Sequence, residues 1–120
     1  MNYEKMELGK LDNLNEKVFL HDSLNLTGCE ISMNRASKGY KVPFNHKHKE
    51  NEEVYIILKG KGFIEVDGEK LEVQEGSVVK IKPDGIRNIE NPNDEDMLFI
   101  VIQTKQGSLK GFTAEDAEIL

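Results

Sequence analysis

The chain has 120 residues, of which 16 are Lys or Arg and 22 are Asp or Glu, giving a formal net charge of -6 at pH 7. This length is typical of one domain with a single core, and the acidic balance, without a block of basic residues, argues against nucleic acid as a partner. The longest apolar runs, residues 54–58 and 97–102, are far shorter than the roughly 20 residues that cross a bilayer, so we expect no membrane association.

The N-terminus and the cysteine content bear on location. The first ten residues lack the basic-then-apolar pattern of a signal peptide. The single cysteine, Cys29, has no partner for an intramolecular disulfide. Both features favour a cytoplasmic location.

The chain is organised as short apolar runs separated by turn signals, and only its end has a helical pattern. Residues 53–58, rich in β-branched and aromatic side chains, give the strongest strand prediction. Asp67-Gly68 lies between two alternating runs and predicts a hairpin, since a type I′ turn needs positive φ at both central positions. Thr113, followed by acidic residues, predicts a short C-terminal helix. Strands are expected over residues 17–20, 26–35, 53–58, 63–66, 69–73, 77–81, 87–91 and 97–103.

This pattern predicts an all-β fold. Short strands at regular spacing indicate a sandwich or barrel, and about ten strands around one core fit a jelly roll. The run 97–103 is apolar on both alternating faces, which is typical of a central strand or of one that packs in an oligomer. We expect an N-terminal strand or arm over residues 1–25, a β-barrel over 26–104 and a C-terminal tail with a short helix over 105–120.

Two of the three histidines, His46 and His48, stand one residue apart, and Glu53 follows five positions after the second. In an extended segment alternate side chains share a face, so both imidazoles project the same way. If residues 49–52 turn the chain, Glu53 on the next strand can aim at the same point, with Tyr55 on the same face. Two imidazole nitrogens and one carboxylate oxygen suit Fe(II), Mn(II), Ni(II) or Zn(II). The pattern therefore predicts a site for a divalent transition metal.

The segment from His46 to Gly60 resembles the first motif of the cupin family. That motif reads Gly, five residues, His-x-His, three or four residues, Glu, six residues, Gly. Here six residues rather than five follow Gly39, and the spacing from His46 through Glu53 to Gly60 matches the motif. Glu52 is the alternative carboxylate, although it lies one residue too far from Gly60. The resemblance implies a jelly-roll barrel, or double-stranded β-helix, with the two histidines and a glutamate as metal ligands.

The second cupin motif is only partly matched. It reads Gly, five residues, Pro-x-Gly, two residues, His, three residues, Asn, whereas this chain has Gly76, six residues, Pro83-Asp84-Gly85 and a shorter loop. Counting back from Asn91 places Arg87 where the family has its third metal-binding histidine. Counting forward from the Pro-x-Gly turn places Asn88 there. In either case the third imidazole is missing.

The missing histidine leaves two interpretations of the site open. A guanidinium beside the metal would oppose binding, so the site would hold metal weakly or not at all. Alternatively, two histidines and one carboxylate form the facial triad of non-haem Fe(II) oxygenases, with Arg87 holding an anionic substrate. We expect either a metal-dependent enzyme acting on a small anionic metabolite or a metal-free ligand-binding or sensory module. In both cases Arg87, Tyr55 and Gln103 are the expected ligand-binding residues.

A homodimer is also expected. Residues 97–102 are apolar on both alternating faces, so one face of this run is left over if the other enters the core. Proteins that resemble this chain are frequently dimers. The sequence thus predicts a second copy of the chain as a partner.

Overall fold

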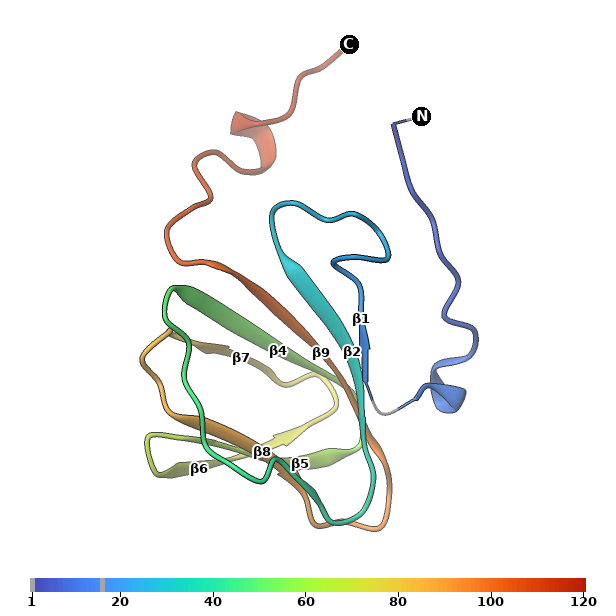
Figure 1. Ribbon diagram of the computed structural model, residues 1–120, viewed down its shortest axis with the longest axis vertical. Helices are drawn as coiled ribbons and strands as arrows, with labels where there is room; N and C mark the ends of the chain where they lie inside the picture. The colour runs from blue at the N-terminus through green and yellow to red at the C-terminus, as the bar shows by residue number, and fades with distance from the viewer. Residues whose placement is uncertain (1, 16) are drawn as a thin grey trace.

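The computed structural model describes residues 2–15 and 17–120, and most of its regular structure is β-strand (Figure 1). Two 3-10 helices, η1 (Leu11–Asn13) and η2 (Thr113–Glu115), lie outside the barrel. The strands are β1 (Lys17–Phe19), β2 (Glu30–Ala36), β3 (Tyr40–Lys41), β4 (Asn51–Lys59), β5 (Lys61–Val66), β6 (Glu69–Gln74), β7 (Val78–Ile81), β8 (Arg87–Asn91) and β9 (Met97–Lys105).

The nine strands found in the described residues form two antiparallel sheets. The five-stranded sheet has the order β1-β2-β9-β4-β7, and the four-stranded sheet has the order β3-β8-β5-β6. This arrangement confirms the all-β jelly-roll prediction. Strand β9 is central, with β2 and β4 on its two sides, which agrees with one of the two expectations for its apolar run.

Two glycines stand at turns where the backbone excludes other residues or disfavours them. Asp67 and Gly68, between β5 and β6, have φ angles of 51° and 83°, the positive pair that the predicted type I′ turn requires. Gly60, between β4 and β5, has a φ of 78°, and a Cβ at this position would lie 2.4 Å from the backbone oxygen of Asp96. The glycine that ends the first motif is therefore needed for close packing of two backbones.

The main core lies between the two sheets. Alternate residues of β4 and β9 point inward, so that the rings of Tyr55 and Phe99 stack with centroids 6.2 Å apart. The buried members of this core are Ala36, Tyr55, Ile57, Ile64, Val73, Ile81, Ile89, Met97 and Phe99. Each fully buried large apolar side chain contributes about 1.5–3 kcal/mol, so this core is the main support for the residues above it.

A second apolar cluster covers the outer face of the five-stranded sheet. Leu14 and Leu20, from the N-terminal segment, pack with Met33 of β2, and Val18 of β1 joins them. The N-terminal segment therefore belongs to the folded structure. Residues 1 and 16 of the predicted arm lie outside the described residues.

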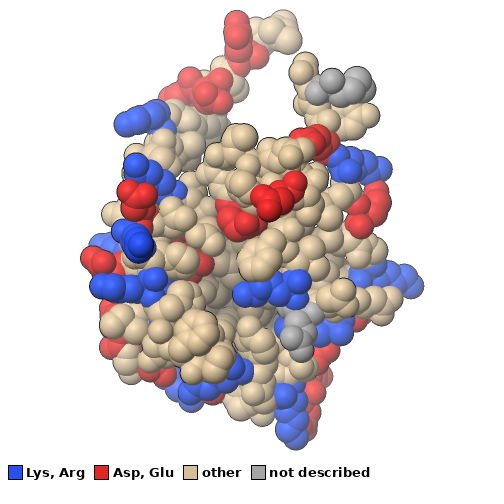
Figure 2. Space-filling view, viewed as in Figure 1, with Lys and Arg blue, Asp and Glu red and all other residues tan. Residues whose placement is uncertain are grey.

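The C-terminal tail extends away from the barrel (Figure 1). The predicted helix is a single 3-10 turn, Thr113–Glu115, because so few residues without a packing partner cannot offset the cost of helix nucleation. Thr113 has a φ of 56° and follows the N-cap residue, Phe112, rather than forming the cap. In the described part of the chain, no helix is long and apolar enough to span a bilayer. Basic and acidic side chains are interspersed on the face that Figure 2 shows, around an area of other residues.

Candidate metal centre

His46 and His48 lie between β3 and β4, where backbone hydrogen bonds fix the chain. His46 forms an isolated antiparallel bridge with Arg87, with N···O distances of 3.2 and 2.9 Å. The His48 N–H donates to the carbonyl of Pro83 at 2.9 Å. Because alternate side chains of an extended segment share a side, the two imidazoles come together, with ring centroids 5.4 Å apart.

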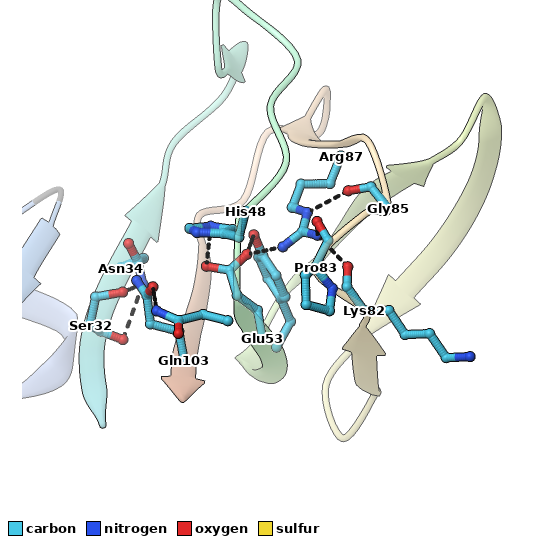
Figure 3. Close-up of polar contacts among 11 residues, drawn as sticks. Ser32, Asn34, His48, Glu53, Lys82, Pro83, Gly85, Arg87 and Gln103 are labelled. Carbon is cyan, nitrogen blue, oxygen red and sulfur yellow. Dashed lines mark hydrogen bonds and ion pairs between the residues drawn. The ribbon is translucent and has the colours of Figure 1, made fainter. Parts of the chain in front are cut away.

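Glu53 completes the cluster from β4. Its side chain faces the barrel interior, the residue is 4% exposed, and its Oε2 lies 3.3 Å from Nε2 of His48 (Figure 3). His46, His48 and Glu53 each offer one ligand atom such that all three atoms lie within 4.8 Å of one another. Glu52 alternates with Glu53 along β4, so it faces the outside of the sheet. The structure thus brings together the three residues predicted to bind metal.

Arg87 is 1% exposed and contacts Glu53 from outside the cavity. Its Nη1 donates to Oε1 of Glu53 at 2.7 Å, and its Nε donates to the carbonyl of Gly85 at 2.9 Å (Figure 3). Its Nη2 donates to the carbonyls of Lys82 and Pro83 at 2.6 and 3.2 Å. Arg87 therefore ties Glu53 to the loop before β8, and a ligand that contacted the guanidinium directly would have to displace one of these acceptors.

Asn88 also lines the cavity beside the cluster, but its side-chain amide binds other groups. Its Nδ2 donates to the carbonyl of Val42 at 2.9 Å and to Oδ1 of Asn45 at 3.0 Å. The side chain of Asn88 therefore braces the segment that leads to the histidines, whereas that of Arg87 reaches Glu53. Arg87, the residue obtained by counting back from Asn91, is thus the one of the two that contacts the glutamate.

Tyr55 lies beside the glutamate and is 6% exposed. Its hydroxyl donates to Oε1 of Glu53 at 3.3 Å. Burial, followed by the nearby charge of Glu53, raises the pKa of Tyr55 well above its ordinary value of 10.0. Tyr55 is therefore a protonated hydrogen-bond donor at neutral pH and not a general base.

His46 has the protonation state that a metal needs. Burial lowers the pKa of His46; Glu53 opposes this shift, and His48, Arg87 and Lys17 reinforce it. A neutral His46 offers a free lone pair. Nδ1 of His46 and Nε2 of His48 are buried and have no hydrogen-bond partner in the described residues, since the 3.3 Å contact with Glu53 does not meet hydrogen-bond geometry. Buried polar atoms without partners are rare, so these donors fit a divalent metal.

The cluster lines a cavity of about 210 Å³ inside the barrel. Tyr55 and Gln103 also line it, whereas Arg87 does not belong to its lining. The side chain of Gln103 is oriented by Asn51, whose Nδ2 donates to its Oε1 at 2.9 Å. Much of the wall beside the cluster is thus polar, and its side chains are held in place by hydrogen bonds.

One larger hollow of the molecule lies elsewhere. It measures about 460 Å³ along β5 and β6 and is lined by residues that include Lys61, Phe63 and Glu72. Neither imidazole of the cluster nor Glu53 lines it. The smaller cavity, which contains the metal-binding side chains, is therefore the better candidate for chemistry.

Sequence reasoning missed part of the cavity wall. Ser32 and Asn34 of β2 line the cavity, and Nδ2 of Asn34 donates to Oγ of Ser32 at 3.0 Å (Figure 3). A signal was present, because these polar residues alternate with Ile31 and Met33. It was hard to interpret, since here the polar face points into the barrel and the N-terminal segment covers the apolar face.

The fold and the sequence are similar to those of known proteins. A family model described as a cupin domain matches residues 35–103. The structure superposes on that of a cupin protein from Bacteroides fragilis with a TM-score of 0.92 and 48% sequence identity, covering 100% of this chain and 98% of the other. It also matches a predicted oxalate decarboxylase from Thermotoga maritima with a TM-score of 0.59 and 25% identity, covering 62% of this chain and 64% of the other. An uncharacterised protein of Methanocaldococcus jannaschii is 36% identical over 75 residues, which are 62% of this chain and 56% of that relative, so the chain spans little more than half of its length.

Proposed function

The chain belongs to the cupin domain family, and from this membership we propose that it holds a divalent transition metal and binds a small anionic metabolite in the adjoining cavity. His46, His48 and Glu53 are the proposed metal ligands. The observation that carries the proposal is the convergence of their three ligand atoms within 4.8 Å, together with two buried ring nitrogens that lack hydrogen-bond partners in the described residues. Fe(II), Mn(II), Ni(II) and Zn(II) all suit this donor set.

The chemistry of such a site follows from its charges. Bound there, a divalent metal would act as a Lewis acid that polarises an oxygen of a bound anion. Arg87 already shares the charge of Glu53 through the 2.7 Å contact, so the carboxylate attracts a metal less than an unpaired one would. We therefore expect metal affinity below that of a site with three histidines. Tyr55, which donates to Oε1 of Glu53, and Gln103 form part of the cavity wall that faces the ligand.

A metal-free binding or sensory module is the second candidate. The observation that favours it is the Arg87–Glu53 ion pair, which neutralises the carboxylate without a metal. In this case the cavity would bind an anion without converting it. The predicted oxalate decarboxylase of Thermotoga maritima supports an anionic metabolite in both candidates, because its description names the dianion of a small carboxylic acid.

Metal analysis separates the two candidates. The protein is loaded anaerobically with Fe(II), Mn(II), Ni(II) or Zn(II), desalted, and measured by elemental analysis alongside His48→Ala and His21→Ala. His21 is the matched control, because it is the remaining histidine of the chain and lies on the surface, away from the cluster. Its Nδ1 contacts Asp22 at 2.8 Å. We expect up to one metal per chain in the parent and in His21→Ala, and a large loss in His48→Ala. Equal metal content in all three proteins, or none in the parent, would contradict the proposed metal site and favour the metal-free binding module.

A homodimer in the cytoplasm completes the proposal. Val54, Ile56 and Ile102 alternate with inward-facing residues, so they lie on the outer face of the five-stranded sheet, and Val78 at its edge is 63% exposed. One exposed and three partly exposed apolar side chains on neighbouring strands support an interface with a second copy. Light scattering at micromolar concentration tests it, with a mass near the 13.6 kDa of one chain as the contrary result.

A further inference from the structure

The side chains around the cavity leave one positive charge in excess. Glu53 carries the negative charge of the cluster, and Arg87 balances it at 2.7 Å while remaining outside the cavity lining. Lys17 is the one Lys or Arg among the described residues that line the cavity. The formal sum over Glu53, Arg87 and Lys17 is therefore +1, and this charge favours an anion.

Lys17 reaches this position because of how β1 is built. Val18 points to the outer face, where it joins the apolar cluster with Leu14 and Met33, so Lys17 and Phe19 on either side of it face the cavity. Strand β1 pairs with β2 in a register that sets Lys17 opposite Asn34. Cross-strand partners on one face are neighbours, so the lysine lies next to the polar wall of the cavity.

The lysine side chain is also oriented. Its Nζ lies 5.4 Å from the centroid of the Phe19 ring, within the range of a cation–π contact. Phe19 is 56% exposed, although it is a large aromatic residue that lines the same cavity. An ammonium and an aromatic face therefore stand side by side at the open part of the cavity, contributed by a strand that lies outside the residues matched by the family model.

We propose that Lys17 selects the ligand by binding its anionic oxygens, those of a small carboxylate or phosphate, while Phe19 covers the apolar part of the ligand. This inference rests on the proposed function of the cavity as a ligand site and is independent of whether metal is bound. The N-terminal strand thus takes the place of Arg87 as the source of positive charge for the ligand. It also predicts discrimination against neutral molecules of the same shape.

The test uses metal-free protein and three simple probes. Acetate, its neutral isostere acetamide, and inorganic phosphate are titrated at constant ionic strength, and the side-chain amide resonances of Asn34 and Gln103 are followed by NMR. Lys17→Gln removes the charge and Lys17→Arg keeps it. Lys80→Gln is the matched control, because Lys80 is an exposed lysine on β7, the opposite edge strand of the same sheet.

We expect the parent, Lys17→Arg and Lys80→Gln to bind acetate or phosphate in preference to acetamide. Lys17→Gln should bind the anion about two- to fivefold more weakly, which is the worth of a solvent-exposed ion pair. Whichever of acetate and phosphate shows the larger loss identifies the anionic group. Equal affinities for Lys17→Gln and Lys80→Gln, or no response of the parent to either anion, would overturn the assignment. This experiment uses metal-free protein, so a negative result would not contradict the proposed metal site. A negative metal analysis would likewise not contradict the role of Lys17.

Discussion

Replacing Arg87 by methionine tests whether the ion pair between its guanidinium and Glu53 stabilises the fold. The substitution keeps a long side chain but removes the 2.7 Å contact with Glu53, which is 4% exposed. Breaking a buried ion pair by removing one partner costs about 3–5 kcal/mol, because the other charge is left buried and unpaired. The carbonyls of Lys82 and Pro83, which Arg87 also binds, are only partly buried and add little to this loss, whereas the carbonyl of Gly85 is buried and adds more. We expect a loss of about 3–5 kcal/mol in the free energy of unfolding, a large share of the stability of a domain.

The measurement is urea unfolding followed by circular dichroism, with linear extrapolation to water. Arg35→Met is the matched control: Arg35 contacts Asp96 at 3.6 Å, and their side chains are 23% and 44% exposed. A partly exposed pair at this distance contributes about 1 kcal/mol or less. The double variant Glu53→Gln/Arg87→Met should be more stable than the sum of its single losses predicts, because no charge is left behind. If Arg87→Met lost no more stability than Arg35→Met, the ion pair between Arg87 and Glu53 would not be a main support of the fold.

Three further predictions concern the turn, the buried phenol and the outer face. Gly60→Ala should cost at least about 2 kcal/mol of unfolding free energy, since it adds a backbone clash to the roughly 1 kcal/mol cost of a positive φ. Gly68→Ala should cost only the roughly 1 kcal/mol of the positive φ, because nothing lies within 4 Å of a Cβ there. Because the folded state holds the Tyr55 proton above pH 10.0 and the unfolded state releases it, stability should fall with rising pH beyond that point by up to about 1.4 kcal/mol per pH unit. Tyr55→Phe should lack this component of the decline, and equal slopes in urea titrations of parent and variant would contradict it. Val78→Lys should shift a dimeric parent toward monomer in light scattering, while an unchanged mass would remove β7 from the interface.

Local patterns were sufficient for most strands and for the histidine cluster. The β-branched run of β4 and the Asp67-Gly68 turn were predicted because a few neighbouring residues decide them. The two-residue strand β3 was missed, since it exists only through its pairing with β8. The C-terminal helix was predicted from capping chemistry alone, and without tertiary contacts that chemistry yields one 3-10 turn.

The environment of the candidate site was less accessible to sequence reasoning, because it depends on contacts between distant segments. Counting left Arg87 and Asn88 as alternatives, and the hydrogen bonds of Arg87 to the 82–85 loop follow from the closed loop geometry. Lys17 lines the cavity because β1 pairs with β2, and Ser32 and Asn34 face inward because the N-terminal segment covers the other side of that strand. No local pattern in the sequence fixes these pairings.

The exchange of a third histidine for Arg87 changes what holds the glutamate in place. In a site with three imidazoles and no metal, a buried carboxylate would lack a positive partner, and its ionised form would be costly. Here Arg87 supplies that partner at 2.7 Å, so the side chain of Glu53 is held in place by an ion pair without metal. Oε1 is committed to Arg87 and Tyr55, whereas Oε2 faces His48. The carboxylate can thus offer one oxygen to the proposed metal while the other keeps its contact with Arg87, so the ion pair does not have to break for a metal to bind.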